Sequence, residues 1–279
     1  MEYADAFCKK PETKQINEKL KALYNTWYLN CVEPFRKSSF SEQERLLNPL
    51  HLLTCTDSYL GSANKTIVFG QESHDTKNEH TLWDWAPVDY YLEESSYAYS
   101  KSIHEGNREL APKTLFLKQR FKLAGLDPKG NLDSNVDKLI FESILLNNLN
   151  KTSYKGSHTP IKKDGGILDK LYQNIEFEGK KLTIFEHEVC ILRPDRIIFM
   201  CGRSYLSHLK RDFKTMLSFQ NIDEAVKKLS INNCLVSAPI QIAYEESLTS
   251  ILLTYHPNAH MTTYQRCDYD NKLRAFIAG

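Results

Sequence analysis

Residues 184–202 have the sequence IFEHEVCILRPDRIIFMCG. Its first half predicts a helix over 184–192 that stops before Pro194, because proline cannot continue a helix. Its second half, 196–202, predicts a short strand. A helix that leads directly into a strand is the repeating unit of a sheet with helices packed on its faces. Further helices and strands are therefore expected on both sides of this segment.

Further strands are predicted on both sides of it. Residues 65–70 are short, apolar and β-branched, which is typical of a buried strand. Residues 140–148 predict a strand with a polar end, 233–245 a strand or hairpin, and 250–257 a last strand. Strands that alternate with helices favour a mostly parallel sheet. We therefore expect an α/β fold with three layers, α/β/α, around a mostly parallel central sheet of about four strands.

The rest of the chain is expected to be mainly helix and loop. An amphipathic helix is predicted over 13–35, and Ser41 with Glu44 forms a capping box that begins a second short helix. A loop with a short helix is predicted over 150–180, and a basic helix over 204–217. We expect a single domain over 1–279, with an N-terminal helical part at 1–60 and an insertion at 75–135.

Composition excludes several classes of protein. The 36 Lys and Arg against 35 Asp and Glu leave a net charge of +1, which excludes a strongly basic DNA-binding tail but not a local basic groove. The seven cysteines form no C-x-x-C pair, which disfavours a zinc site and favours free thiols in a reducing compartment. No run of 18 apolar residues occurs. A cytoplasmic protein without a membrane segment is expected, nucleoid-associated or nuclear depending on the host.

Polar residues stand where three of the predicted strands end. They are Gln71 and Glu72, Asn148, and His256. Ligands of parallel sheets bind at the carboxyl ends of the strands, so we expect these side chains to converge there. A carboxylate can stabilise a sugar cation or activate water, an amide can read a base edge, and a neutral imidazole can support a leaving anion. Together these groups suit cleavage of an N-glycosidic bond.

Four blocks in the same order resemble motifs of the uracil-DNA glycosylase superfamily. VFGQESH (68–74) is similar to its G-Q-D-P-Y loop, and LLNNLNK (145–151) resembles its strand that ends in Asn-apolar-x-Lys. EVCILRPDRIIFMCG (188–202) is similar to its helix–Pro–strand segment, and TYHPN (254–258) to its T-Y-H-P-S motif. The resemblance covers residues 65–262 and implies the fold of that superfamily.

The resemblance also implies roles for individual residues. Glu72 stands at the position of the water-activating Asp, and His256 at that of the His that stabilises the leaving base. Asn148 stands at the position of the base-reading Asn, with Asn147 as the shifted alternative. Gly70 and Gln71 would line the base pocket with backbone groups.

Further positions are implied for contacts to the base and to DNA. Trp85, or Trp83, would stack on the flipped base, and His74 stands where some members have a Tyr that excludes a 5-methyl group. Met261, after His260, is the expected wedge that fills the emptied stack. The expected DNA contacts are Lys151, Arg203, Asn258, His260 and Met261.

Three residues depart from the superfamily pattern in the first block. Glu72 replaces Asp, Ser73 replaces Pro, and His74 replaces Tyr, so a modified or larger pyrimidine stays open as substrate. Thr152 stands where iron–sulfur members have a Cys, so no cluster, metal or other cofactor is expected.

The sequence thus predicts a monofunctional DNA glycosylase for uracil or a related modified or damaged base. It would act as a monomer on DNA and leave an abasic site. The alternatives are a non-catalytic nucleic-acid binder with this fold, a glycosylase for a hypermodified pyrimidine in foreign DNA, and a hydrolase of small nucleosides.

Overall fold

The structure of the chain is a computed structural model. The structure describes residues 8–38, 47, 50–72, 88, 92, 143–152, 167–202, 205–217, 222–224, 227, 236–237, 239–244, 247–255 and 261–278. The predicted capping box at Ser41 and Glu44 lies outside these residues, as does nearly all of the 75–135 insertion.

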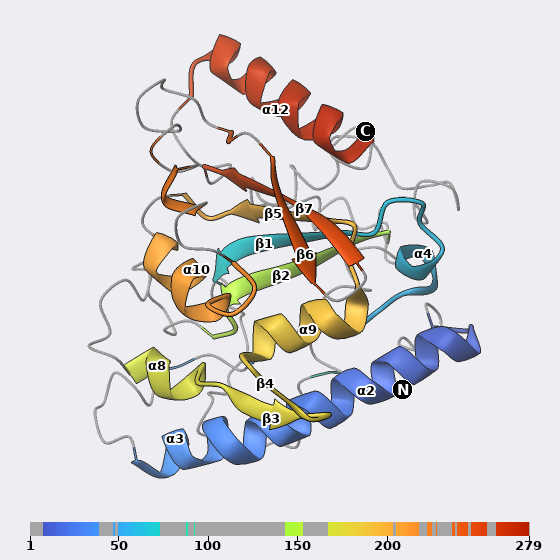
Figure 1. The fold of residues 1–279 in the computed structure, drawn as a ribbon, viewed down its shortest axis with the longest axis vertical. Coiled ribbons are helices and arrows are strands. Elements are labelled where there is room, and N and C mark those ends of the chain that lie inside the picture. The colour runs from blue at the N-terminus through green and yellow to red at the C-terminus, as the bar shows by residue number, and fades with distance from the viewer. Residues whose placement is uncertain are drawn as a thin grey trace, which may run out of the picture.

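A central sheet of five strands organises the chain (Figure 1). Its order is β2-β1-β5-β7-β6, in which β2, β1, β5 and β7 are parallel and β6 is antiparallel to β7. The strands are β1 (Thr66–Glu72), β2 (Ile144–Asn150), β5 (Arg196–Met200), β6 (Ile240–Tyr244) and β7 (Ser247–Thr254). The prediction of a mostly parallel α/β fold is confirmed. The fifth strand, β6, comes from the segment that was predicted as a strand or hairpin.

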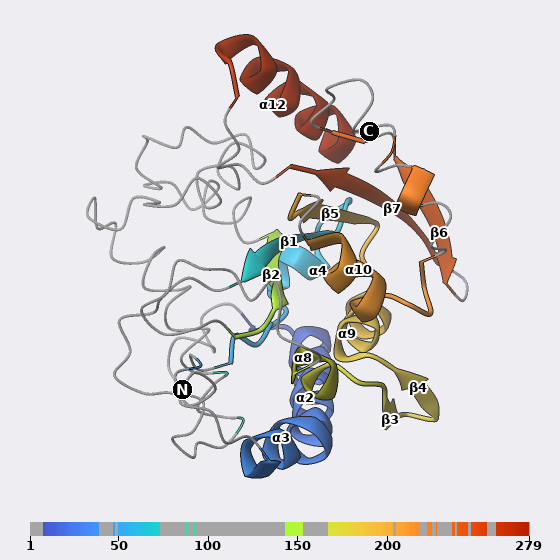
Figure 2. The same cartoon turned by 90° about the vertical axis from the view of Figure 1, so that its left-hand side faces the viewer.

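Successive side chains along each strand point to opposite faces of the sheet, and they form an apolar cluster on each face. Ile67, Phe69 and Phe199 belong to the large core on the side of α9 (Ile184–Leu192). Their neighbours Val68 and Ile198 belong to a second cluster, which includes Tyr269 and Leu273 of α12 (Thr263–Ala278). Because both faces are buried, the strands are apolar throughout rather than alternating. The sheet therefore lies between α12 on one side and α9 on the other (Figures 1 and 2).

Helix α9 begins and ends at clear local signals. Thr183 is its N-cap and forms a capping box with Glu186, in which each side chain binds the other residue's backbone N–H. At the other end Arg193 adopts a left-handed conformation with φ of 47°, directly before Pro194. The predicted helix over 184–192 is confirmed.

The N-terminal helix packs against α9. α2 (Pro11–Trp27) continues through a π-helical segment, η1 (Tyr28–Val32), into α3 (Glu33–Ser38). The prediction of an amphipathic helix over 13–35 is confirmed, since Leu20, Leu23 and Trp27 are buried in the core around α9. A single turn, α4 (Asp57–Leu60), capped by Thr56, precedes β1.

Three segments differ from the sequence prediction. The 150–180 segment contains a short helix, α8 (Ile167–Leu171), as expected, but also an antiparallel hairpin of β3 (Ile175–Phe177) with β4 (Lys180–Leu182). The basic helix predicted over 204–217 is shorter, α10 (Leu206–Asp212). Helix α12, which covers one face of the sheet, was not predicted.

Candidate functional site

The carboxyl ends of four parallel strands meet at one edge of the sheet, here called the carboxyl edge. On β1 and β2, Gly70 lies opposite Asn148 and Glu72 opposite Asn150. Further along, Met200 at the end of β5 lies opposite Thr254 at the end of β7. In Figure 1 the arrowheads of β1 and β2 point to this edge on the left. The ends of the strands that carry all four blocks therefore lie at the same edge of the sheet.

The strand order reverses between β1 and β5. The chain passes from β1 to β2 on one side and from β5 to β7 on the other, so β1 and β5 flank the switch point at which open α/β sheets bind ligands. Gln71 Nε2 donates to the carbonyl oxygen of Cys201 across this point, at 2.9 Å. The Gly202 N–H donates to the Thr254 carbonyl at 3.0 Å. These two hydrogen bonds hold the ends of β1, β5 and β7 together.

Neighbouring asparagines on β2 face opposite sides of the sheet. Asn147 is buried on the α9 side, where its Nδ2 donates to Glu188 Oε2 at 2.8 Å. Its Oδ1 accepts from Lys151 Nζ at 3.1 Å and from the backbone N–H of Asn148 at 2.9 Å. Since these contacts occupy both its amide group and its carbonyl oxygen, Asn147 is suited to holding the end of β2 rather than to reading a base. Asn148 is half-buried on the other face, opposite Gly70.

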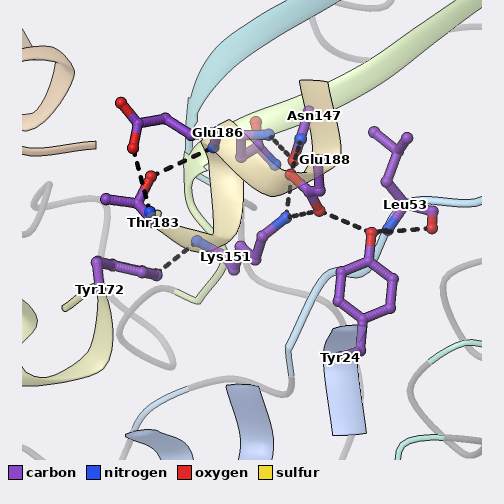
Figure 3. Close-up of polar contacts among 9 residues, drawn as sticks. Tyr24, Leu53, Asn147, Lys151, Tyr172, Thr183, Glu186 and Glu188 are labelled. Atoms are coloured by element: carbon purple, nitrogen blue, oxygen red, sulfur yellow. Dashed lines mark hydrogen bonds and ion pairs between the residues drawn. The ribbon is translucent and has the colours of Figure 1, made fainter. Parts of the chain in front are cut away.

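Glu188 is the centre of a buried polar network under the end of β2 (Figure 3). Its Oε1 accepts from Lys151 Nζ at 2.7 Å and from the Tyr24 hydroxyl at 2.7 Å. The Tyr24 hydroxyl in turn accepts from the Leu53 N–H at 3.1 Å. The network joins α9 and β2 to α2 and to the segment before β1. Sequence reasoning missed Glu188, because its partners are far from it along the chain.

Burial shifts the pKa values in this network. Desolvation lowers the pKa of Lys151, and the Glu188 carboxylate opposes that shift. Desolvation also raises the pKa of Tyr24 well above its ordinary value, and the charge of Glu188 adds to the rise. The charges of Lys151 and Glu188 compensate each other, which is the condition under which an ion pair is tolerated away from water.

The position of Lys151 argues against its predicted contact with DNA. Its side chain and that of Glu188 both have 0% exposure. Its backbone is held as well, because the Lys151 N–H donates to the Tyr172 hydroxyl and its carbonyl accepts from the His51 N–H. A fully buried ammonium group that is paired with a carboxylate does not reach a phosphate, so Lys151 is a structural residue here.

A second buried charge lies on α10. The Asp212 side chain is fully buried, and both of its oxygens accept from the Arg211 guanidinium, at 2.5 and 3.0 Å. Burial raises the pKa of Asp212 to about 7, although the charges of Arg211 and Lys151 act in the opposite direction. The backbone carbonyl of Asp212 accepts from the Thr183 hydroxyl, so α10 is tied to the N-terminus of α9.

The structure describes only some of the predicted site residues. Glu72 is the last residue of β1, but only its backbone is described. Gly70 is buried in β1, and Met261 is half-buried against the apolar cluster beneath α12. The residues of which nothing is described are His74, Trp83, Trp85, Arg203, His256, Asn258 and His260.

One residue at the carboxyl edge was not predicted at all. Asn150, the last residue of β2, has 0% exposure, and neither its Nδ2 nor its Oδ1 has a hydrogen-bond partner among the described residues. The signal was present in the sequence, since the alternation of a strand places Asn150 on the same face as Asn148.

The described cavities lie away from this edge. One, of about 470 Å³, is lined by α2, α9 and the β3–β4 hairpin. Another, of about 610 Å³, lies between β6, β7 and α12, beside Arg196 at the amino end of β5. Within the described ranges no three His, Cys, Asp or Glu side chains are grouped as metal ligands.

No protein-family model matches the chain, and a search of curated proteins found no significant match. Among the described helices none is both long and apolar enough to cross a lipid bilayer.

Proposed function

We propose that the protein is a monofunctional DNA glycosylase that removes uracil, or a related modified or damaged base, and leaves an abasic site. The observation that carries the proposal is the register of β1 and β2. It sets Gly70 against Asn148 and Glu72 against Asn150 at the edge where parallel sheets bind ligands. The blocks that resemble the glycosylase motifs thus end side by side on neighbouring strands.

In the proposed reaction the base is flipped out of the DNA duplex into the site. The bond between C1′ of the sugar and the base nitrogen breaks, and its electron pair leaves with the base. Water then bonds to C1′ while Glu72 accepts its proton or stabilises the cationic sugar. Asn148 hydrogen bonds the polar edge of the base, and His256 donates to the base as negative charge develops on it.

Two structural features support Asn148 in this role. Its backbone N–H is held by Asn147 Oδ1, which fixes the backbone from which its side chain extends. Gly70, opposite it, carries no side chain that could fill the space above β1, and a glycine within a strand often marks the close approach of a ligand. Preorganised groups of this kind need no rearrangement during the reaction.

The direct test is base release from labelled oligonucleotides that carry uracil, hypoxanthine, mispaired thymine or 5-hydroxymethylcytosine. A monofunctional glycosylase gives strand breaks only after alkali. Asn148→Ala and His256→Ala should each lower the rate at least 100-fold, as is typical when one such group is removed. If both variants release base as fast as the wild type, the proposed mechanism is wrong.

A non-catalytic binder of the same fold is the main alternative, and it is favoured by Glu72 in place of Asp. Such a protein would bind oligonucleotides with strong salt dependence, because phosphate contacts release counterions, but would release no base. A hydrolase of small nucleosides would act on free nucleosides instead. DNA as partner, the monomeric state and a cytoplasmic or nuclear location remain part of the proposal.

A further inference from the structure

A row of polar side chains crosses the sheet on the face that α12 covers, at the amino end of β5. The strand register places Arg196 of β5 beside Ser250 of β7, and Ser250 beside Gln241 of β6. Two residues further along the same face, Ile198 and Leu252 belong to the apolar cluster beneath α12. The apolar cluster therefore ends at this row.

The row lines a cavity between the sheet and α12. The cavity has a volume of about 610 Å³, which is within the range of small-molecule sites. Its other polar lining residues are Ser237 and Lys272, and none of the described residues that line it is acidic. The rest of the wall is apolar and consists of Val236, Pro239, Leu252, Ala275 and Phe276. The space therefore suits a ligand with an apolar body and one polar end.

Arg196 supplies the buried charge of this cavity. It is 9% exposed, so it is largely removed from water but remains accessible to a small ligand. Its guanidinium donates to the Ile277 carbonyl near the end of α12, and it has no carboxylate partner among the described residues. A buried arginine is normally paired with an anion, and it carries five N–H donors, of which this bond uses one. The remaining donors and the positive charge point to an anion that binds from outside the chain.

Two serine hydroxyls add further donors to the cavity. Ser250 Oγ accepts from Gln241 Nε2 at 2.7 Å, and Ser237 Oγ accepts from the Leu253 N–H at 3.0 Å. Each hydroxyl therefore keeps its own hydrogen to donate, and no acceptor for it lies among the described residues. A guanidinium with hydroxyl donors nearby is suited to the oxygens of a carboxylate or a phosphate.

The charge of the lining distinguishes between these two anions. The second cation, Lys272, lies 2.7 Å from Asp268 Oδ2 and is thus paired within the chain. Arg196 alone leaves one positive charge, which a single carboxylate neutralises. A phosphate monoester carries about 1.5 to 2 negative charges at pH 7, so part of its charge would lack a partner. The charge balance therefore favours a monocarboxylate.

We propose that this cavity is a binding site for a small monocarboxylate with an apolar body, in which Arg196 pairs with the carboxylate. The apolar wall contacts the body of the ligand, and the two serine hydroxyls bind the carboxylate oxygens. Arg196 is the first residue of β5, so the site lies at the opposite end of that strand from the carboxyl edge. It is therefore independent of the proposed glycosylase function.

The test is an NMR titration of the isotope-labelled protein with hexanoate at neutral pH. Hexanoate should shift the amide signals of β6, β7 and α12 with a Kd of about 1 mM or lower. Hexanamide, which has the same length but no charge, should bind at least about tenfold more weakly. Acetate, which lacks the apolar body, should also bind at least about tenfold more weakly.

Three results of this titration would overturn the proposal. They are the absence of shifts at about 10 mM hexanoate, equal binding of hexanoate and hexanamide, and equal binding of hexanoate and acetate. Hexyl phosphate is included as the phosphate counterpart and should bind more weakly than hexanoate. Tighter binding of hexyl phosphate would overturn the assignment of a carboxylate.

Two variants test the residues of the site. Arg196→Met removes the charge and should weaken hexanoate binding at least about tenfold. Because it also removes the bond to the Ile277 carbonyl, Ser250→Leu is the second variant, which leaves Arg196 in place. It removes one hydroxyl and fills the space beside the guanidinium, while the exposed Gln241 side chain can bond water instead. Ser250→Leu should also weaken binding at least about tenfold, and wild-type affinity in this variant would contradict the proposal.

A matched control uses the arginine that lines the other large cavity. Arg193, at the C-terminus of α9, lines the cavity of about 470 Å³ between α2, α9 and the β3–β4 hairpin. Arg193→Met removes the same charge from the chain and should leave hexanoate binding unchanged. An equal loss of affinity in Arg193→Met and Arg196→Met would show a general attraction of anions and overturn the assignment.

Discussion

The Nζ atom of Lys151 lies 2.7 Å from Oε1 of Glu188, and neither side chain is exposed to solvent. The pair joins the end of β2 to the middle of α9, and Asn147 and Tyr24 complete the hydrogen bonds of the carboxylate (Figure 3). This contact holds the end of β2 against α9. Its contribution to the free energy of unfolding can be measured independently of any activity.

Removing one partner of this pair should strongly destabilise the fold. Lys151→Met leaves the Glu188 carboxylate buried without its counter-charge, and the expected loss in the free energy of unfolding is about 3–5 kcal/mol. Urea unfolding monitored by circular dichroism measures it. The double variant Lys151→Met/Glu188→Met should be more stable than the sum of the two single losses predicts. Additive losses would show that the two charges do not interact.

Asn147 and Asn148 should respond in opposite ways to truncation. Asn147→Ala removes contacts to Glu188, Lys151 and the Asn148 N–H, so it should lower the free energy of unfolding by about 1–3 kcal/mol. Asn148→Ala should change the free energy of unfolding little, but it should lower the rate of base release at least 100-fold. Chemical unfolding and base-release rates of both variants provide the comparison. The reverse pattern would make Asn147 the base-reading residue.

The fold could be predicted largely where local signals agree. The helix that ends before Pro194 and the strand that follows it correspond to α9 and β5, because capping, proline and apolar character all point the same way. The β3–β4 hairpin was missed because each of its strands has three residues. Its turn residues Glu178 and Gly179, with φ of 49° and 74°, have the conformation that tight hairpins favour. Helix α12 was missed because charged residues surround the few apolar ones that pack on the sheet.

The site could be predicted only in part, for a physical reason. Strand order along the chain places Gly70, Glu72 and Asn148 at one edge, and the register agrees. Which of two adjacent asparagines is engaged in the interior depends on Glu188, 41 residues away from Asn147. The same limit applies to Lys151, which reads as a surface cation in the sequence but becomes fully buried through its carboxylate partner.

The bond from Gln71 to the Cys201 carbonyl should matter for both stability and activity. Gln71→Met keeps the length of the side chain but removes the donor, so the free energy of unfolding should fall by about 1 kcal/mol. Base release should fall as well, because a bond that holds the end of β1 to the residue after β5 is lost. Gln241→Met is the matched control, since Gln241 Nε2 donates to Ser250 Oγ on β7, away from the carboxyl edge. Equal release rates in the two variants would remove Gln71 from the site.

The stability of the protein should carry a pH dependence from Asp212. Its pKa is about 7 in the folded state against 3.8 as the ordinary value, so the folded state holds the proton more tightly. The stability contributed by Asp212 is therefore fully present below pH 3.8 and is lost as the pH rises towards 7, by at most about 1.4 kcal/mol per pH unit.

Comparison of the wild type with Asp212→Asn isolates this contribution. The pKa of His51, lowered by burial to about 4, gives a dependence of opposite sign that is common to both proteins. The wild type should lose stability relative to the variant between pH 4 and 7, as followed by urea unfolding at each pH. A constant difference would mean that the Asp212 carboxylate is ionised throughout this range.

We propose that the carboxyl edge of the sheet cleaves an N-glycosidic bond, with Glu72 as its carboxylate. The most direct measurement is alkali-dependent strand cleavage of the oligonucleotide panel by the wild type and by Glu72→Gln, with DNA binding of both proteins determined in parallel. We predict breaks for at least one base only after alkali, and a loss of release in the variant with DNA binding retained. Base release by Glu72→Gln at the wild-type rate, or binding of DNA by the wild type without release of any base, would contradict the account.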